Sequence, residues 1–293
     1  MNLRPGIAGF FLLSMTTAGE AVSFTGHAVP VGRGSLGGTL PPPGFYLRDC
    51  SVFYTADRLN LSNGERAPVD FKLSGYANLL RGLWVSEGKF LGGNYAIDAS
   101  IVAQTTTITL NGVTRSGSGL ADSYIQPVGV GWHGERWDAV FGYTLWVPTG
   151  ESEPGGVRPG KGFWGHMVSA GATVYLDERK SWAASLVNRY ETNQEERHSH
   201  ITPGDQISME WGLSKKVAAR ADVGFVGCYQ KQVTKDAGPL ASGAMDSEFS
   251  LGPELVVTWP VKRMAGTVRY IQVVEAKGRP QARALTWVIS KRF

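Results

Sequence analysis

Apolar and polar residues alternate with a period of two over most of this chain. In one clear example Trp137, Phe141 and Leu145 share one parity, while Asp138 and Thr144 share the other. This period is that of a β-strand, whose successive side chains point to opposite faces. The pattern predicts about twelve strands and no helix, at residues 45–55, 70–84, 92–105, 119–132, 136–148, 164–177, 181–193, 205–215, 219–233, 247–259, 264–275 and 282–293.

The last predicted strand carries a second signal. Leu285, Trp287, Ile289 and Phe293 share one face, and the chain ends on the aromatic Phe293. This resembles the C-terminal strand that the barrel-assembly machinery of Gram-negative outer membranes recognises, although Lys291 stands where an apolar residue is usual. A terminal strand of a soluble sandwich is the alternative for this strand taken alone.

Connection lengths separate a membrane barrel from a sandwich, since outer-membrane barrels alternate short periplasmic turns with longer external loops. Short turns are predicted at 133–136, 177–180, 216–219 and 260–263. Longer connections are predicted at 56–69, 106–118, 149–163, 194–204 and 234–246, and 276–281 is the one short connection among them. Tryptophans stand at strand ends, as expected at a membrane interface, at Trp132, Trp137, Trp164, Trp182 and Trp259. We therefore predict an all-β, antiparallel, up-and-down membrane barrel.

Composition agrees with this fold. The chain has 293 residues, 38 of them glycine, and its mean hydropathy of −0.12 excludes a helical membrane protein but not a barrel. The formal net charge is only +4, and the basic residues are scattered. Nothing therefore predicts binding to nucleic acid.

The N-terminal part divides into two. Residues 1–21 combine Arg4, a short apolar run and small residues, which predicts a secretory signal peptide. Residues 22–44 are rich in Gly and Pro; their GxGxxG motif lacks the flanking strand and helix of a nucleotide site. This segment is expected to begin on the periplasmic side, and residues 45–293 form the barrel. Two alternatives remain open for residues 22–44: a disordered tail, or a segment that folds into the periplasmic mouth or the lumen and narrows the barrel.

Charged residues in the middle of strands predict the lining of the lumen, because a basic residue facing lipid near the bilayer centre costs about 2–4 kcal/mol. They could form ion pairs that fill the barrel, with Arg189 as the expected partner of Glu210, or line a polar pathway for a solute. The predicted inward-facing residues are Asp122, Asp138, Arg189, Glu191, Glu210, Asp222, Glu254 and Arg269.

Signs of catalysis or cofactor binding are weak. A metal site is conceivable at His198 and His200, which share a polar loop with Glu195 and Glu196, but a solvated loop is the favoured interpretation. No matching Ser and His can be placed on neighbouring strands as in outer-membrane phospholipases. We therefore expect no metal, no cofactor and no enzymatic activity.

Several segments together resemble the outer-membrane family named for the MetA pathway of phenol degradation. That family implies an outer-membrane β-barrel of a Gram-negative bacterium, encoded near genes for the catabolism of organic compounds, and carries no catalytic residues. We therefore expect a porin-like channel in outer-membrane lipid for small organic solutes, aromatic or hydrophobic catabolic substrates in particular. The alternatives are a structural or surface-interaction barrel and an outer-membrane enzyme. The segments are PPPGFYLRDCSVFYTADRLN at 41–60, GLADSYIQPVGVGWHGERWDAVFGYTLWVPTG at 119–150, GKGFWGHMVSAGATVYLDERKSWAASLVNRYETN at 160–193, ITPGDQISMEWGLSKKV at 201–217, VGFVGCYQKQVT at 223–234 and the terminal KRF.

Overall fold

The fold was obtained as a computed structural model, which describes residues 25–152, 157–239, 241 and 243–293. Within these residues the chain forms thirteen strands and a single 3₁₀ turn, η1 (Pro260–Lys262). The strands are β1 (Gly44–Ala56), β2 (Phe71–Phe90), β3 (Gly93–Leu110), β4 (Val113–Leu120), β5 (Ser123–His133), β6 (Trp137–Val147), β7 (Gly165–Tyr175), β8 (Trp182–Asn193), β9 (Gln206–Ala218), β10 (Ala221–Gln232), β11 (Ser247–Trp259), β12 (Met264–Lys277) and β13 (Arg283–Arg292).

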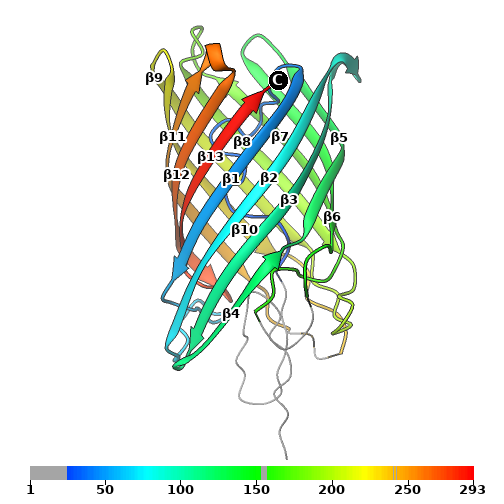
Figure 1. Cartoon of the computed structure of the whole chain (residues 1–293), viewed down its shortest axis with the longest axis vertical. Helices are drawn as coiled ribbons and strands as arrows, with labels where there is room; N and C mark the ends of the chain where they lie inside the picture. Colours follow the sequence, from blue (N-terminus) through cyan, green and yellow to red (C-terminus); the bar gives the residue numbers. More distant parts are fainter. Residues whose placement is uncertain (1–24, 153–156, 240, 242) are drawn as a thin grey trace, which may run out of the picture.

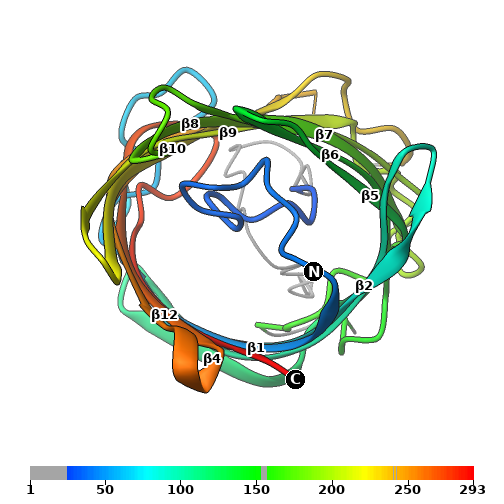
Figure 2. The same cartoon turned by 90° about the horizontal axis from the view of Figure 1, so that it is seen from above.

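Twelve of these strands close into an antiparallel barrel, and β4 pairs only with β3 (Figures 1 and 2). Each barrel strand pairs with its neighbours along the chain, except that β3 pairs directly with β5. The barrel closes where β1 pairs with β13, from Tyr46 opposite Arg292 to Thr55 opposite Arg283. The terminal residue adds to this closure, since the Phe293 amide donates to the Phe45 carbonyl at 2.9 Å. The predicted fold class is confirmed.

One predicted loop is a β-hairpin instead. Residues 106–118 belong to the end of β3 and to β4, which meet in a two-residue turn at Asn111 and Gly112, where φ is 49° and 80°. Positive φ at both positions belongs to a type I′ turn, for which Asn-Gly is a strong signal. The period-two pattern did not predict the hairpin, because Thr105, Thr107 and their neighbours give it no continuous apolar face.

The two ends of the barrel differ in their connections (Figure 1). The end near the C-terminus carries short turns, such as 219–220 and 260–263. The opposite end carries the β3–β4 hairpin and the long connections 57–70, 148–164, 194–205 and 233–246. We call these the short-turn end and the long-loop end. None of the residues described here forms a helix of the length and hydrophobicity needed to cross a bilayer.

The outer surface of the barrel is apolar. Large side chains such as Phe141, Leu186 and Phe225 each expose about two fifths of their surface there, far more apolar surface than a soluble monomer tolerates. Carboxylates interrupt this surface in places. On β1, for example, Asp49 lies on the outward face, where the Asn78 amide donates to both of its oxygens at 3.1 and 3.3 Å. The outer wall is therefore suited to lipid, with a small polar cluster on β1 and β2.

The interior of the barrel contains residues 25–43, which we call the lumen segment (Figure 2). It begins at the long-loop end, where the Lys161 amine donates to the Thr25 carbonyl at 3.0 Å, and it reaches the short-turn end, where β1 starts. We expected this segment to begin on the periplasmic side, but its described part begins at the long-loop end. Polar groups at that end bind the backbone of residues 25–28 and hold it there. The predicted signal peptide, 1–21, lies outside the described residues.

Candidate functional site

The lumen segment has little regular structure of its own, so its backbone needs hydrogen-bond partners. Side chains on the inner barrel wall provide them. The Glu191 and Glu210 carboxylates accept from backbone amides of residues 27, 28 and 33, and Gln230 donates to the Ala28 carbonyl at 2.8 Å. The inward-facing charges therefore hold a second layer of chain against the barrel.

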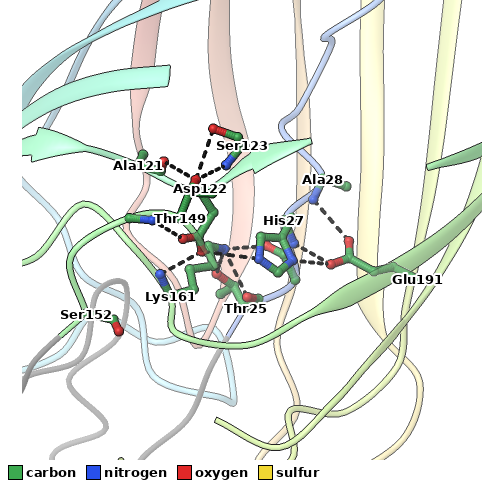
Figure 3. Close-up of polar contacts among 12 residues, drawn as sticks. Thr25, His27, Ala28, Ala121, Asp122, Ser123, Thr149, Ser152, Lys161 and Glu191 are labelled. Carbon is green, nitrogen blue, oxygen red and sulfur yellow. Dashed lines mark hydrogen bonds and ion pairs between the residues drawn. The ribbon is translucent and has the colours of Figure 1, made fainter. Parts of the chain in front are cut away.

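At the long-loop end, His27 lies between two carboxylates (Figure 3). Its Nδ1 is 2.8 Å from Glu191 Oε1, and its Nε2 is 3.4 Å from Asp122 Oδ2. The imidazole stacks on Trp146, with 5.1 Å between ring centroids, and meets the edge of Phe163 at 4.6 Å. The imidazole and both carboxylates are buried, so His27 is held by hydrogen bonding and by ring packing together.

Lys161 completes this cluster from the loop between β6 and β7. Burial lowers the pKa of its amine to about 8, although Glu191 and Asp122 act in the opposite direction. Burial alone would raise the pKa of Asp122, but the hydrogen bond and charge of His27 and the backbone amides of Lys161 and Gly150 bring it below its ordinary value of 3.8. The attachment of the lumen segment at this end therefore depends on the charge states of groups in the loops.

In the middle of the barrel, two ion pairs bind the lumen segment. Glu210 accepts from Arg189 Nη2 at 2.7 Å and from the Arg33 amide at 3.2 Å. Glu254 accepts from Arg269 Nε at 2.7 Å and from the Ser35 hydroxyl at 2.6 Å. Each carboxylate thus joins a cross-strand arginine to the lumen segment, so neither arrangement is an ion pair alone.

Glycines allow the close approach of the two layers. A Cβ at Gly38 would lie 2.2 Å from the backbone carbon of Ala172 on β7, and one at Gly212 on β9 would lie 2.6 Å from Ser35 Cα. Real Cβ atoms do not approach other atoms this closely, so both positions require glycine. The glycine content of residues 22–44, and some of the glycines in the strands, follows from this contact.

The eight predicted lumen residues can now be placed. Six contact the lumen segment: Asp122, Asp138, Glu191, Glu210, Glu254 and Arg269. Arg189 binds Glu210, and the Arg189–Glu210 pair expected from the sequence is present. Asp222 lies on the inner face near the short-turn end, half-buried and opposite Lys216 of β9. What the sequence did not reveal is that a segment of the chain, rather than neighbouring strands, supplies most of the partners.

The sequence analysis missed several charged residues of the lumen, among them Arg33, Arg48, Arg81 and Asp98. Arg81 on β2 donates through Nε to Asp98 on β3 at 2.8 Å. Arg48 on β1 lies directly opposite Arg81 in the strand register. The parity of Arg48, Arg81 and Asp98 was available from the sequence. However, β1 to β3 mix apolar and charged residues on the inner face, so the alternation there is poor.

The inner wall has two parts that differ in burial. The inward faces of β6 to β11, which we call the covered wall, are mostly buried; Val187, for example, is 1% exposed and Glu210 3%. The inward faces of β1, β2 and β13, which we call the open wall, are largely half-buried between residues 46 and 54 and between 75 and 83. Most of the lumen segment lies against the covered wall. Near the short-turn end it also meets the open wall, where Leu40 packs on Tyr46 and Leu83, and the rest of the open wall stays accessible within the barrel.

A closed barrel with an apolar outside and charged residues inside is an outer-membrane barrel, and the protein lies in the outer membrane of a Gram-negative bacterium. Its residues 56–288 match the family model described as "Putative MetA-pathway of phenol degradation". The chain belongs to this family, as the resemblance in the sequence predicted. No curated protein matches the chain.

Solved structures support the fold. The COG4313 outer membrane channel from Pseudomonas putida F1 is 13% identical, with a TM-score of 0.76 over 87% of this chain and 97% of that one. The translocator domain of the autotransporter NalP from Neisseria meningitidis is also 13% identical, with a TM-score of 0.51 over 86% and 90%. The CymD monoaromatic hydrocarbon channel has a TM-score of 0.44 at 10% identity over 86% and 89%, which is too distant to bear on this chain. At these identities the likeness concerns the fold alone.

Proposed function

We propose that this protein is a channel for small organic catabolic substrates, with aromatic or hydrophobic compounds as its solutes. One observation carries the proposal: most of the open wall is only half-buried, inside a barrel whose opposite wall is covered. A barrel whose interior served only for stability would be filled by side chains on both walls. Membership of a family named for phenol degradation agrees with an organic solute.

The solute would enter at the long-loop end, since longer loops face the cell exterior in barrels of this class. It would then pass along the open wall, past Val52 and Leu79, toward the short-turn end. The lumen segment narrows this path by occupying the other side. No catalytic step and no cofactor belongs to this proposal.

Two paired variants test it. Leu79 faces the lumen, whereas Leu80, the next residue on β2, faces lipid and is 44% exposed. Leu79→Trp should reduce single-channel conductance in a planar bilayer and slow uptake of radiolabelled phenol at low concentration by porin-deficient cells. Leu80→Trp should leave both unchanged. Absence of conductance and of uptake in the unaltered protein would favour a structural barrel, and lipid hydrolysis by the purified protein would favour an enzyme.

We also propose that the barrel-assembly machinery recognises β13. Leu285, Trp287 and Ile289 face outward, and Phe293 is 62% exposed at the closing seam. Deletion of Phe293 should lower the amount of folded, heat-modifiable protein in the outer membrane, while Val261→Ala in the exposed turn at the same end should not. Equal assembly of the two variants would contradict this role.

A further inference from the structure

We infer that the open wall holds a binding site for the carboxylate of a small organic anion, formed by the guanidinium groups of Arg33 and Arg48. This inference deepens the proposed function and rests on it, because it names the solute class that the lumen would select.

The first observation is that the guanidinium groups of these two arginines have no partner within the part of the chain that the structure describes. The other three arginines at this level of the barrel, Arg81, Arg189 and Arg269, each form an ion pair with a carboxylate. The Arg33 and Arg48 guanidinium groups form no hydrogen bond or ion pair with any residue that the structure describes. Both side chains remain partly accessible to solvent within the lumen.

The second observation is that positive charge accumulates around Arg33 and Arg48, both of which lie within electrostatic range of Arg81. Arg48 lies opposite Arg81 in the register of β1 and β2 and is repelled by it. Arg33 is repelled by Arg189 and Arg81, and the carboxylates that attract it, Glu210 and Asp98, are already bound to those two arginines. A guanidinium presents a planar fork of donors that matches a carboxylate. An anion at this point would relieve the repulsion.

Arg189, which lies within electrostatic range of Arg33, also has an unsatisfied donor. Arg189 uses Nη2 to bind Glu210, but its Nη1 is buried and has no hydrogen-bond partner among the described residues. A buried donor without a partner costs free energy. Arg189 therefore adds positive charge near Arg33, which strengthens the attraction for an anion there.

The third observation concerns the surface beside Arg48. Toward the long-loop end, the next inward row consists of Cys50 with Leu79 and Val288 on either side. The row after it has Val52 beside Ala77. These side chains are half-buried and apolar, or nearly so. An apolar patch directly adjacent to Arg48 suits a molecule with an apolar body and a single carboxylate, such as an aromatic acid.

Cys50 makes the site measurable. It faces the lumen next to Arg48 and is partly accessible, whereas Cys228, the second cysteine, is fully buried beneath the lumen segment. A thiol reagent added to the folded protein should therefore react at Cys50. The anionic sulfonatoethyl methanethiosulfonate should react faster than the cationic trimethylammonium reagent of similar size, and benzoate should slow the reaction while benzyl alcohol at the same concentration should not.

The decisive comparison uses Arg48→Gln and Arg33→Gln in the full-length protein, with Arg115→Gln on the external β3–β4 hairpin as the matched control. Each lumen variant should weaken protection of Cys50 by benzoate about tenfold, the loss expected for one charged hydrogen bond, and should remove the preference for the anionic reagent. The control should change neither. Conductance and phenol uptake, measured on the same preparations, show whether the channel itself works.

The outcomes are distinct. If phenol passes but benzoate gives no protection, or protects both lumen variants as well as the unaltered protein, the anion site is overturned while the channel stands. If the unaltered protein shows neither conductance nor phenol uptake, the proposed function fails. Protection by benzoate would then show a binding site without transport. Equal protection by benzyl alcohol would assign the site to the apolar patch alone and would also overturn the inference.

Discussion

The covered wall and the open wall come from the same barrel, yet they solve different problems. On the covered wall, small and polar residues and glycines receive a second layer of chain, and carboxylates such as Glu191 and Glu254 satisfy its backbone. On the open wall, apolar residues and Arg48 remain accessible within the lumen. Stability of the lumen segment is therefore concentrated on one side and the proposed contact with solute on the other, so the two can be altered separately.

The largest effect is expected from removing the lumen segment. Deletion of residues 25–39, with residues 1–24 retained, should raise single-channel conductance severalfold, because the covered wall would then also be accessible. Retention of heat-modifiable migration would show that the barrel still forms. Unchanged conductance in a folded deletion variant would mean that the segment does not limit the pathway.

The next effect concerns Glu210, which binds both Arg189 and the lumen segment. Glu210→Leu should lower the free energy of unfolding by about 3 kcal/mol, because it leaves Arg189 buried without a partner; water in the lumen would reduce this value. Denaturant titration in vesicles would measure it. The double variant with Arg189→Leu should be less destabilised than the sum of the two single variants. Strictly additive effects would show that the pair does not contribute.

A matched pair of valines compares the walls directly. Val187 on the covered wall contacts the lumen segment near Gly37, whereas Val288 on the open wall is half-buried. Val187→Ala should cost about 2 kcal/mol through lost burial and a residual cavity, and Val288→Ala should cost less than about 0.5 kcal/mol. Denaturant titration under identical conditions checks this. Equal costs would remove the distinction between the two walls.

The smallest effect is a pH dependence of the contact at His27. The pKa of Asp122 is lowered in the folded protein, so its contribution is present above about pH 4 and is lost as the pH falls through the lowered pKa. The pKa of Lys161 is lowered from 10.5 to about 8, so its contribution also decreases as the pH falls, but between those two values. The lumen segment should therefore bind less tightly at the long-loop end as the pH falls through each of these two ranges. This should appear as a modest rise in conductance.

Variants separate these windows. Asp122→Asn should remove the acidic change and Lys161→Met the alkaline one, and Asp177→Asn in a short-turn connection should affect neither. A conductance that is constant across both windows in the unaltered protein would contradict the pH dependence.

The fold could be read from the sequence in detail, and the reason is local. In a barrel that spans a membrane, every strand must alternate between lipid and lumen, so each strand carries its own signal, as β6 does at Trp137 and Asp138. The hairpin of β3 and β4 extends beyond this constraint, and its Thr-rich strands lacked that signal. The short Asn-Gly turn was the clue that remained.

The candidate site was only partly accessible to the same reasoning. Parity placed Glu210, Glu254 and Arg269 on the inner face, but it could not state what they bind. Their partners on the lumen segment lie about 180 to 240 residues away along the chain. Such contacts leave no local pattern, since Arg33 and Ser35 occur in a stretch of Gly and Pro that fits a linker equally well.

What the sequence determined by itself is therefore the barrel: its twelve wall strands, most of their connections and the membrane that surrounds them, because these follow from a repeated pattern that each strand must satisfy alone. Tertiary structure decided which wall the lumen segment covers. That choice depends on where glycines such as Gly212 allow close approach and where buried carboxylates meet backbone amides. Among the described residues it also left the Arg33 and Arg48 guanidinium groups without partners, and it placed an apolar surface beside Arg48. This property exists only once the barrel has closed.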